Sequence, residues 1–242
     1  MPDGLLLLHA FPLDHTMWEP QAAAFRGACT VVAPDFPGFG DAAPTALPPT
    51  IDSAADAAAE AMARAGIDRA VVCGLSLGGY VALAFLRRHP ARVRGLVLAN
   101  TRADADDEAA RERRAALAAR LRSQGNILAE NPPPLLSDAA PPALVARVKG
   151  IIARQPPESI ARAAEAMAAR PSALGDLATI AAPTLVITSS GDTLIPPAVT
   201  QSTFAAVPGA RFEIIPGVGH LSNLEAPEAF NALLRDHIRT CE

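Results

Sequence analysis

The sequence predicts an α/β protein: a doubly wound, mostly parallel sheet with an inserted helical cap. Short apolar runs alternate with helical patterns along the chain, which is the order of elements in a sheet covered on both faces. From residue 101 to residue 171 only helical patterns occur, over too many residues for one crossover between strands. We therefore expect residues 1–100 and 172–242 to form the α/β core, and residues 101–171 to form the cap.

The composition indicates a globular chain that is long enough for a sizeable core. Of the 242 residues 50% are apolar and 19% are charged, which excludes a disordered protein. The net charge of -4 offers no basic surface, so we expect no nucleic-acid partner. No apolar run approaches the roughly 20 residues of a membrane span, and the start lacks a cationic signal-peptide region. We expect a cytoplasmic monomer or homodimer with no membrane partner.

The first third of the chain supplies two strand patterns. Residues 4–8 form an apolar run that is typical of a strand buried on both faces. A loop follows, and residues 18–26 then show a helical pattern. Residues 29–33 predict a second strand, which ends in a loop rich in proline and glycine. Residues 52–65 predict a helix with capping side chains at its start.

The stretch around Ser76 is the most informative motif. Residues 70–73 are apolar, residues 74–78 read G-x-S-x-G, and a helical pattern then runs to about residue 89. Strand, tight turn and helix is the context in which G-x-S-x-G forms a nucleophile elbow. Its glycines let neighbouring backbone approach closely, and the helix N-terminus favours developing negative charge. The motif by itself leaves open a glycine-rich turn that holds an incidental serine.

The remaining elements continue the pattern on both sides of the cap. Residues 94–99 predict the strand after the elbow helix. The cap contains a charged, Ala-rich helical stretch over residues 102–123 and helical patterns over residues 142–153 and 157–170. The sheet pattern then resumes with a strand, a helix, a strand and a final helix, over residues 184–188, 197–206, 211–215 and 226–239.

A serine nucleophile needs a neighbouring base that a third group orients, and two strand ends supply candidates. In open α/β sheets, ligands bind outside the carboxyl ends of the strands. Asp192 follows the strand at 184–188, and His220 follows the strand at 211–215. We therefore predict that Ser76, Asp192 and His220 form a catalytic triad.

The other titratable residues make weaker candidates. Asp104 stays open as an alternative acid after the preceding strand, and Asp35 is expected to shape its loop. The remaining histidines are His9, His15, His89 and His237. His9 and His15 lie in the first loop. His89 and His237 lie on predicted helices, where surface or half-buried positions are expected.

A tetrahedral intermediate also needs two N–H donors for its oxyanion. The residue after the nucleophile supplies one, the backbone N–H of Leu77, and the loop after the first strand supplies the other. Phe11 is our candidate there, because Pro12 has no N–H and Ala10 comes too early in the turn. The alternative is that Phe11 is an ordinary hydrophobic loop residue.

We predict neither a cofactor nor a metal ion. The histidines are scattered, and the three cysteines (Cys29, Cys73 and Cys241) are widely spaced, which favours neither metal ligands nor disulfides. No G-x-G-x-x-G opens a helix after the first strand, so a dinucleotide is not expected.

Taken together, the motifs resemble the α/β-hydrolase superfamily in its small bacterial branch, near 3-oxoadipate enol-lactone hydrolases and the carboxylesterase of biotin synthesis. The resemblance covers nearly the whole chain. It rests on five stretches: residues 7–11 (LLHAF), 35–40 (DFPGFG), 74–79 (GLSLGG), 191–196 (GDTLIP) and 219–220 (GH). It implies the α/β-hydrolase fold without a cofactor. It also implies that Ser76 is the nucleophile, His220 the base and Asp192 its orienting acid, with the Phe11 and Leu77 amides as the oxyanion hole.

The sequence departs from that family pattern in four places. Ala10 replaces a usual glycine, Asp41 stands where serine is common, and Ser189 replaces a frequent glycine three positions before the acid. Only four residues, 1–4, precede the leucines of the first strand, so we expect the usual N-terminal hairpin to be reduced or absent. The strand at 29–33 would then lie near a sheet edge, which needs cover.

The resemblance implies a serine carboxylesterase or enol-lactonase (EC 3.1.1) that cleaves a small-molecule ester or lactone through an acyl-enzyme. Alternatives are a C–C bond hydrolase or haloperoxidase-like perhydrolase with the same triad, and a ligand-binding receptor with little turnover. Two groups of residues are candidates for the substrate pocket. The first group is the arginines, for which surface positions are the alternative: Arg102, Arg113 and Arg147. The second group is apolar, and core positions are the alternative for it: Trp18, Phe39, Leu75 and Leu194.

Overall fold

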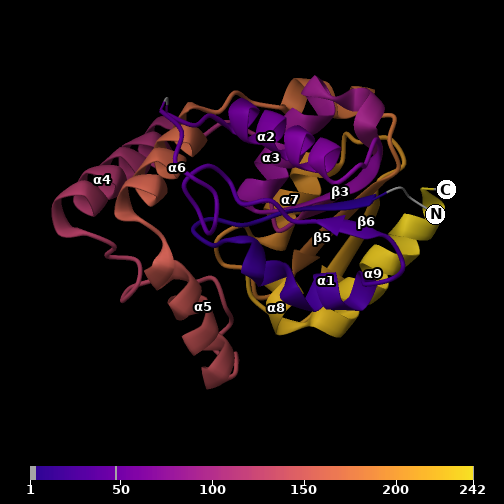
Figure 1. Ribbon diagram of the computed structural model, residues 1–242. Coiled ribbons are helices and arrows are strands. Elements are labelled where there is room, and N and C mark those ends of the chain that lie inside the picture. The colour runs from indigo at the N-terminus through magenta and orange to yellow at the C-terminus, as the bar shows by residue number, and fades with distance from the viewer. Residues whose placement is uncertain (1–3, 47, 242) are drawn as a thin grey trace.

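Within the described residues, 4–46 and 48–241, the computed structural model has six strands in one open parallel sheet with helices on both faces (Figure 1). The strand order is β2-β1-β3-β4-β5-β6, and every neighbouring pair is parallel. The strands are β1 (Gly4–Leu8), β2 (Thr30–Val32), β3 (Ala70–Leu75), β4 (Val93–Ala99), β5 (Thr184–Ser189) and β6 (Arg211–Ile215). The predicted doubly wound sheet is confirmed.

Helices α2 and α3 cover one face of the sheet, and α1 and α9 cover the other (Figure 1). The helices of the core are α1 (Glu19–Phe25), α2 (Ile51–Arg64), α3 (Leu77–Arg88), α7 (Pro197–Phe204), α8 (Ser222–Glu225) and α9 (Pro227–Thr240). Short 3₁₀ turns, η1 (His15–Trp18), η2 (Pro90–Arg92) and η3 (Leu174–Thr179), complete the connections. Every residue of β1, β3 and β5 is buried, as expected for strands covered on both faces.

Three helices between β4 and β5 form the predicted cap: α4 (Glu108–Gln124), α5 (Pro142–Arg154) and α6 (Pro157–Ala169). Helices α4 and α6 pack side by side at one end of the sheet, and α5 projects away from them (Figure 1). The division of the chain into domains at residues 101 and 171 remains a prediction.

Helix α4 begins later than the sequence pattern indicates, at Glu108 rather than Arg102. The Asp107 side chain caps the helix by accepting a hydrogen bond from the Ala110 N–H at 2.7 Å. The residues before it hold acidic side chains that pair with arginines: Asp104 with Arg102, and Asp106 with Arg114 and Arg170. A helical period alone could not reveal that this stretch is used for ion pairing.

A buried glutamine fastens the cap to the core. Gln155, between α5 and α6, donates from Nε2 to Asp14 Oδ2 at 2.8 Å and accepts at Oε1 from the Gly40 N–H at 3.0 Å. Asp14 also accepts from Arg154 at 3.0 Å. Burial would raise the pKa of Asp14, but these donors and Thr16 outweigh that effect and hold it below its usual value. The cap therefore contacts both loops that follow β1 and β2.

Strand β2 is short and lies at one edge of the described sheet, where it pairs with β1. This is the edge position expected for the second strand. A short edge strand limits pairing with other chains. Along the described part of the chain, no helix has both the length and the apolar character needed to cross a bilayer.

Candidate active site

Ser76 occupies a strained turn between β3 and α3. Its φ of 57° and ψ of -114° lie in a region that non-glycine residues rarely adopt. The Ser76 N–H donates to the Ala99 carbonyl at 2.9 Å, and its carbonyl accepts from Thr101 Oγ1 at 2.8 Å. A Cβ on Gly74 would collide with the backbone of Gly78, so the turn can close only with glycine there. The structure thus places Ser76 in a tight, strained turn between a strand and a helix.

Asp192 and His220 meet at the ends of β5 and β6. His220 Nδ1 lies 2.8 Å from Asp192 Oδ2, and both side chains are buried. The other carboxylate oxygen accepts from the N–H groups of Leu194 and Ile195, each at 2.9 Å. Burial would raise the pKa of Asp192, but its hydrogen bonds from His220, Ile195 and Asn100 outweigh that effect and hold it below the usual value. Asp192 is therefore an ionised acceptor for the imidazole.

Asn100 is a site residue that the sequence reasoning missed. It follows β4 with a φ of 45°, and its Nδ2 donates to Asp192 Oδ2 at 2.9 Å and to Ser189 Oγ at 2.8 Å. Its Oδ1 accepts from Ser222 Oγ at 2.7 Å, two residues after His220. Asn100 thus joins the ends of β4 and β5 to the histidine loop. Its position directly after a strand is the one signal that could have indicated it.

Ser189, one of the four departures from the family pattern, belongs to the same network. Its hydroxyl donates to the Gly219 carbonyl at 2.5 Å and accepts from Asn100. A glycine at this position could make neither bond. The serine therefore ties the loop that carries Asp192 to the loop that carries His220.

The backbone N–H groups of Phe11 and Leu77 come from neighbouring strand ends, because β1 pairs with β3. Leu77 is the first residue of α3, so its N–H has no acceptor within the helix. The Phe11 N–H donates no hydrogen bond within the described residues, and the Phe11–Pro12 peptide bond is cis. Ala10, the departure beside Phe11, is buried, and its N–H points to Met17 Sδ at 3.1 Å.

His9 shapes this loop from inside the core. Its Nε2 accepts from the Phe36 N–H at 3.0 Å, so Nδ1 carries the proton and donates to the Ala10 carbonyl at 3.1 Å. The ring packs against Phe36 with centroids 4.1 Å apart. Burial lowers the pKa of His9, which keeps the imidazole neutral. His9 therefore connects the loops that follow β1 and β2 and holds no place in the predicted triad.

Ser76 and His220 face a shared cavity of about 370 Å³ beneath the cap. Ser76 Oγ makes no hydrogen bond to His220 within the described structure; such contacts often tighten only when substrate binds. The apolar lining residues are Phe11, Leu117, Pro133, Leu135, Met167, Leu194 and Ile195. The charged lining residues are Arg102, Asp106, Arg113 and Arg114.

The predicted pocket residues divide accordingly. Arg102, Arg113 and Leu194 line the cavity. Arg147 instead bonds to the Thr16 carbonyl and to Glu19, each at 2.9 Å. The three remaining apolar candidates are fully buried core residues: Trp18, Phe39 and Leu75. Arg114 was not singled out from the sequence, where nothing distinguishes it from the other arginines of α4.

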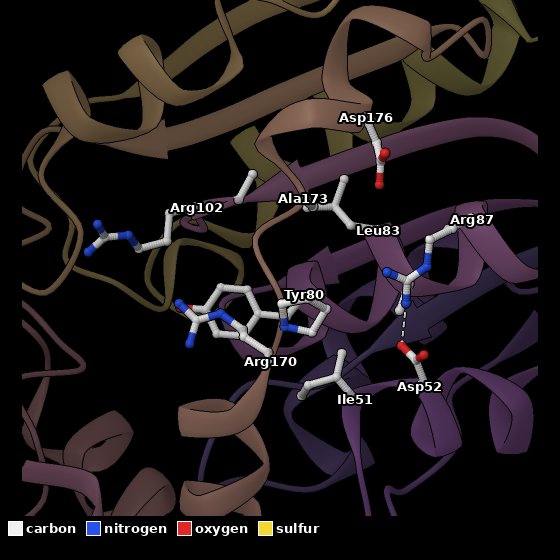
Figure 2. Close-up of a pocket in the computed structure, with 12 residues that line it drawn as sticks. Ile51, Asp52, Tyr80, Leu83, Arg87, Arg102, Arg170, Ala173 and Asp176 are labelled. Atoms are coloured by element: carbon white, nitrogen blue, oxygen red, sulfur yellow. Dashed lines mark hydrogen bonds and ion pairs between the residues drawn. The ribbon is translucent and has the colours of Figure 1, made fainter. Parts of the chain in front are cut away.

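A smaller pocket of about 30 Å³ adjoins the cavity and shares Tyr80 and Arg102 with it (Figure 2). The Arg170 guanidinium lies over the Tyr80 ring, 4.0 Å from its centroid. Burial raises the pKa of Tyr80, although Arg170 partly opposes this effect, so the phenol remains neutral. The contact joins the end of the cap to the elbow helix, since Tyr80 lies one turn after Ser76.

The rival candidates lie elsewhere. Asp104, the alternative acid, pairs with Arg102, and no contact joins it to His220 in the described chain. His89 bonds to Asp56 at 2.8 Å on the surface side of α3. His237 is buried at 3% exposure, so the expected surface or half-buried position is wrong for it. The fold brings α9 against β4, which a helical period read alone does not reveal.

One group of potential metal ligands occurs among the described residues: His15, Asp35 and Asp41. The Asp35 carboxylate already accepts from the His15 N–H at 2.6 Å, from His15 Nδ1 at 2.8 Å and from the Asp41 N–H at 2.9 Å. These bonds close the loop after β2. Asp35 therefore shapes its loop, as expected, and the Asp41 backbone contributes to that turn.

Comparison of the sequence with known proteins identifies the family to which the chain is similar. A sequence model of the alpha/beta hydrolase family matches residues 5–233. The pimeloyl-[acyl-carrier protein] methyl ester esterase of Neisseria meningitidis serogroup C is 30% identical over 252 aligned residues, which span 98% of this chain and 95% of that protein. The chain spans 63% of the length of another, longer curated relative.

Solved structures of the same architecture are also similar. A thermophilic esterase from Thermogutta terrifontis, solved with malate bound, superposes with a TM-score of 0.94 at 35% identity, covering 98% of this chain and 90% of that chain. The enol-lactonase from Burkholderia xenovorans LB400 has a TM-score of 0.89 at 28% identity, with coverage of 99% and 92%.

Proposed function

Because the chain belongs to the alpha/beta hydrolase family, we propose that it is a serine hydrolase that cleaves a carboxylic ester or lactone through an acyl-enzyme. The observation that carries this proposal is the buried Asp192–His220 pair, 2.8 Å apart, beside a cavity that Ser76 also lines. A base oriented by an ionised carboxylate is what a serine nucleophile needs. The similarity to an esterase and an enol-lactonase supports ester or lactone substrates.

In the proposed mechanism, His220 takes the proton of Ser76 as Oγ attacks the carbonyl carbon. Asp192 stabilises the imidazolium that forms. The oxyanion accepts from the N–H groups of Phe11 and Leu77, and each such donor is worth about 2.7–4 kcal/mol. His220 then protonates the leaving alcohol oxygen, which leaves an acyl-enzyme.

The second half of the cycle uses the same residues. His220 deprotonates a water molecule, the hydroxide adds to the acyl carbonyl, and the Phe11 and Leu77 amides again bind the oxyanion. Collapse releases the carboxylic acid and returns the proton to Ser76. For a lactone the alcohol stays attached to the acid, so one ring-opened product leaves.

Removal of the Ser76 hydroxyl tests the proposal. We expect Ser76→Ala to lower kcat for p-nitrophenyl esters by about 10³-fold or more, because the nucleophile is lost while the fold is kept. A fluorophosphonate should label the wild-type protein once, at Ser76, by intact-mass and peptide analysis. Ser202→Ala, which removes an exposed hydroxyl on α7, is the matched control and should keep full activity.

Two results would contradict the proposal: undiminished ester hydrolysis by Ser76→Ala, or labelling at another residue. Stable ligand binding with no acyl-enzyme would instead favour the receptor alternative. Esters of increasing acyl length, assayed beside lactones, would define the acyl preference. The cytoplasmic location and the monomeric or dimeric state remain predictions.

A further inference from the structure

The cavity face of α4 carries two arginines. Ala110, Arg113, Arg114 and Leu117 all line the cavity that contains Ser76. Their spacing of three, four and seven residues places them on one face of the helix. The neighbouring face, with Ala118 and Leu121, is buried. Helix α4 thus presents cationic side chains to the cavity and small or apolar ones to its own packing contacts.

Part of the guanidinium charge around the cavity is already neutralised. Arg102 pairs with Asp104, and the carboxylate of Asp106 is shared by Arg114 and Arg170. Burial would raise the pKa of Asp106, but these two arginines outweigh that effect and hold it below its usual value. Because one carboxylate serves two arginines, this triplet retains a net positive charge.

Arg113 adds a second unbalanced charge. Within the described residues its guanidinium has no carboxylate partner and no hydrogen bond, although it borders the cavity. An arginine on an exposed helix face is ordinarily just solvated. Arg113 is exposed, but it also borders a cavity with apolar lining residues such as Leu117 and Met167, and a guanidinium beside apolar surface attracts an anion more strongly than one in open water.

We propose that Arg113, with Arg102 and Arg114 beside it, binds a carboxylate on the substrate, so that the enzyme acts on esters or lactones of dicarboxylic acids. This inference rests on the proposed function, since it assigns the substrate class of the same site. A guanidinium presents a planar pair of donors that matches both oxygens of a carboxylate. The anionic end would lie against α4 and leave the second carbonyl for Ser76.

Two esters that differ at one end of the acyl chain test this assignment. Mono-p-nitrophenyl glutarate carries a terminal carboxylate where p-nitrophenyl valerate carries a methyl group. We expect wild type to show the higher kcat/KM for the glutarate ester. Arg113→Gln should lower that value about 10- to 100-fold, mainly through KM, and lower the value for the valerate ester much less.

Arg111→Gln is the matched control. Arg111 lies on the same helix two residues away, is exposed and does not line the cavity. The Arg111→Gln variant removes the same charge from the same helix but outside the cavity, so it should leave the preference for the glutarate ester within about twofold of wild type. Equal losses in the two variants, or no preference in wild type, would overturn the assignment.

Glutarate binding, measured by calorimetry, tests the carboxylate assignment separately from the proposed serine mechanism. If Ser76→Ala hydrolyses esters as wild type does, the serine mechanism fails. Glutarate should still bind to wild type and to Arg111→Gln, and bind at least about tenfold more weakly to Arg113→Gln. Failure of wild type to bind glutarate, or equal binding by both arginine variants, would overturn the carboxylate assignment even with the serine mechanism intact.

Discussion

At the scale of single residues, Asn100 links the three strand ends behind the candidate triad. Its side chain donates to Asp192 Oδ2, the same oxygen that accepts from His220, and it holds Ser189 and Ser222 as well. The positive φ of 45° is tolerated by asparagine better than by most residues. We interpret Asn100 as a positioning residue that acts on His220 through Asp192.

Asn100→Ala should lower kcat by about tenfold or more with little change in KM, because the Asp192–His220 pair loses alignment. Loss of a donor to the carboxylate also raises the pKa of Asp192 and makes it a stronger acceptor for the imidazolium. A stronger acceptor stabilises the imidazolium, so this second effect moves the acid limb of the kcat/KM profile to higher pH. The measurement is the pH dependence of ester hydrolysis.

Asn126→Ala provides the control for this prediction. Asn126 also donates two hydrogen bonds, to the carbonyls of Ile152 and Gln155, but these lie in the cap. Its loss should lower the thermal stability and leave the acid limb in place. If both variants gave the same pH profile as wild type, Asn100 would have only a structural role.

The sequence could identify those site residues that stand in a recognisable motif or directly after a strand pattern and have acid–base or nucleophilic chemistry. Ser76 stands in G-x-S-x-G between a strand and a helix, and Asp192 and His220 follow strand patterns directly. Asn100 also follows a strand, yet an asparagine has no acid–base chemistry that would single it out. Arg113 was one of several arginines in the cap. The helical period of 3.6 residues does not reveal which helix face meets the cavity, so the sequence could not show which arginines line it.

At the scale of elements, α8 joins the segment between α4 and α5 to the loop that carries His220. The Glu225 carboxylate accepts from the Gly219 N–H at 2.8 Å and from the Ser137 N–H and Oγ at 3.0 and 2.5 Å. The Leu221 N–H also donates to the Leu135 carbonyl at 2.9 Å. The segment between α4 and α5 is therefore held against both sides of His220.

Glu225→Ala should lower the free energy of unfolding by about 2–3 kcal/mol, since it removes an ionised acceptor from three donors. We expect faster amide hydrogen exchange at Ser137 and Gly219, measured by mass spectrometry or NMR. Glu228→Ala, an exposed glutamate at the start of α9, should change stability by no more than about 0.5 kcal/mol. Unchanged exchange in Glu225→Ala would show that the carboxylate does not hold the segment between α4 and α5.

Elements were predictable where one local pattern decides them. Each strand of the sheet was expected from a short apolar run, and its observed bounds differ from the predicted ones by at most two residues. The start of α4 was not, because Asp106, just before the helix, is engaged by Arg170 from the far end of the cap. A partner far along the chain cannot be read from local periodicity. The same reason hid the contact between Glu225 and Ser137.

At the scale of the whole molecule, the parallel sheet gathers groups that are far apart in sequence at one edge. The ends of β1, β3, β4, β5 and β6 supply Phe11, Ser76, Asn100, Asp192 and His220 in that order. The cap closes this edge and adds the charged wall of α4. Under the proposed function the reacting groups belong to the sheet and the charged groups that contact substrate belong to the cap, so we expect substitutions in the cap to alter selectivity while leaving the reaction itself unchanged.

The opposite end of the sheet carries a buried histidine that should make folding depend on pH. His237 of α9 packs against β4 at Gly95, where a Cβ would come within 3.3 Å of its Nε2. Burial disfavours the imidazolium and Arg211 repels it, which lowers the pKa of His237 to about 4 from 6.5. Between these values the unfolded chain binds a proton that the folded protein does not.

The free energy of unfolding should therefore be highest above about pH 6.5 and fall as the pH drops toward 4. A pKa difference of about 2.5 corresponds to about 3 kcal/mol from this one side chain. Urea unfolding of wild type and of His237→Gln across this range would measure it. His9, buried and neutral, contributes in the same direction to both proteins and cancels in the comparison. The variant should lose less stability on acidification than wild type, and equal losses would show that His237 is protonated as readily in the folded protein as in the unfolded chain.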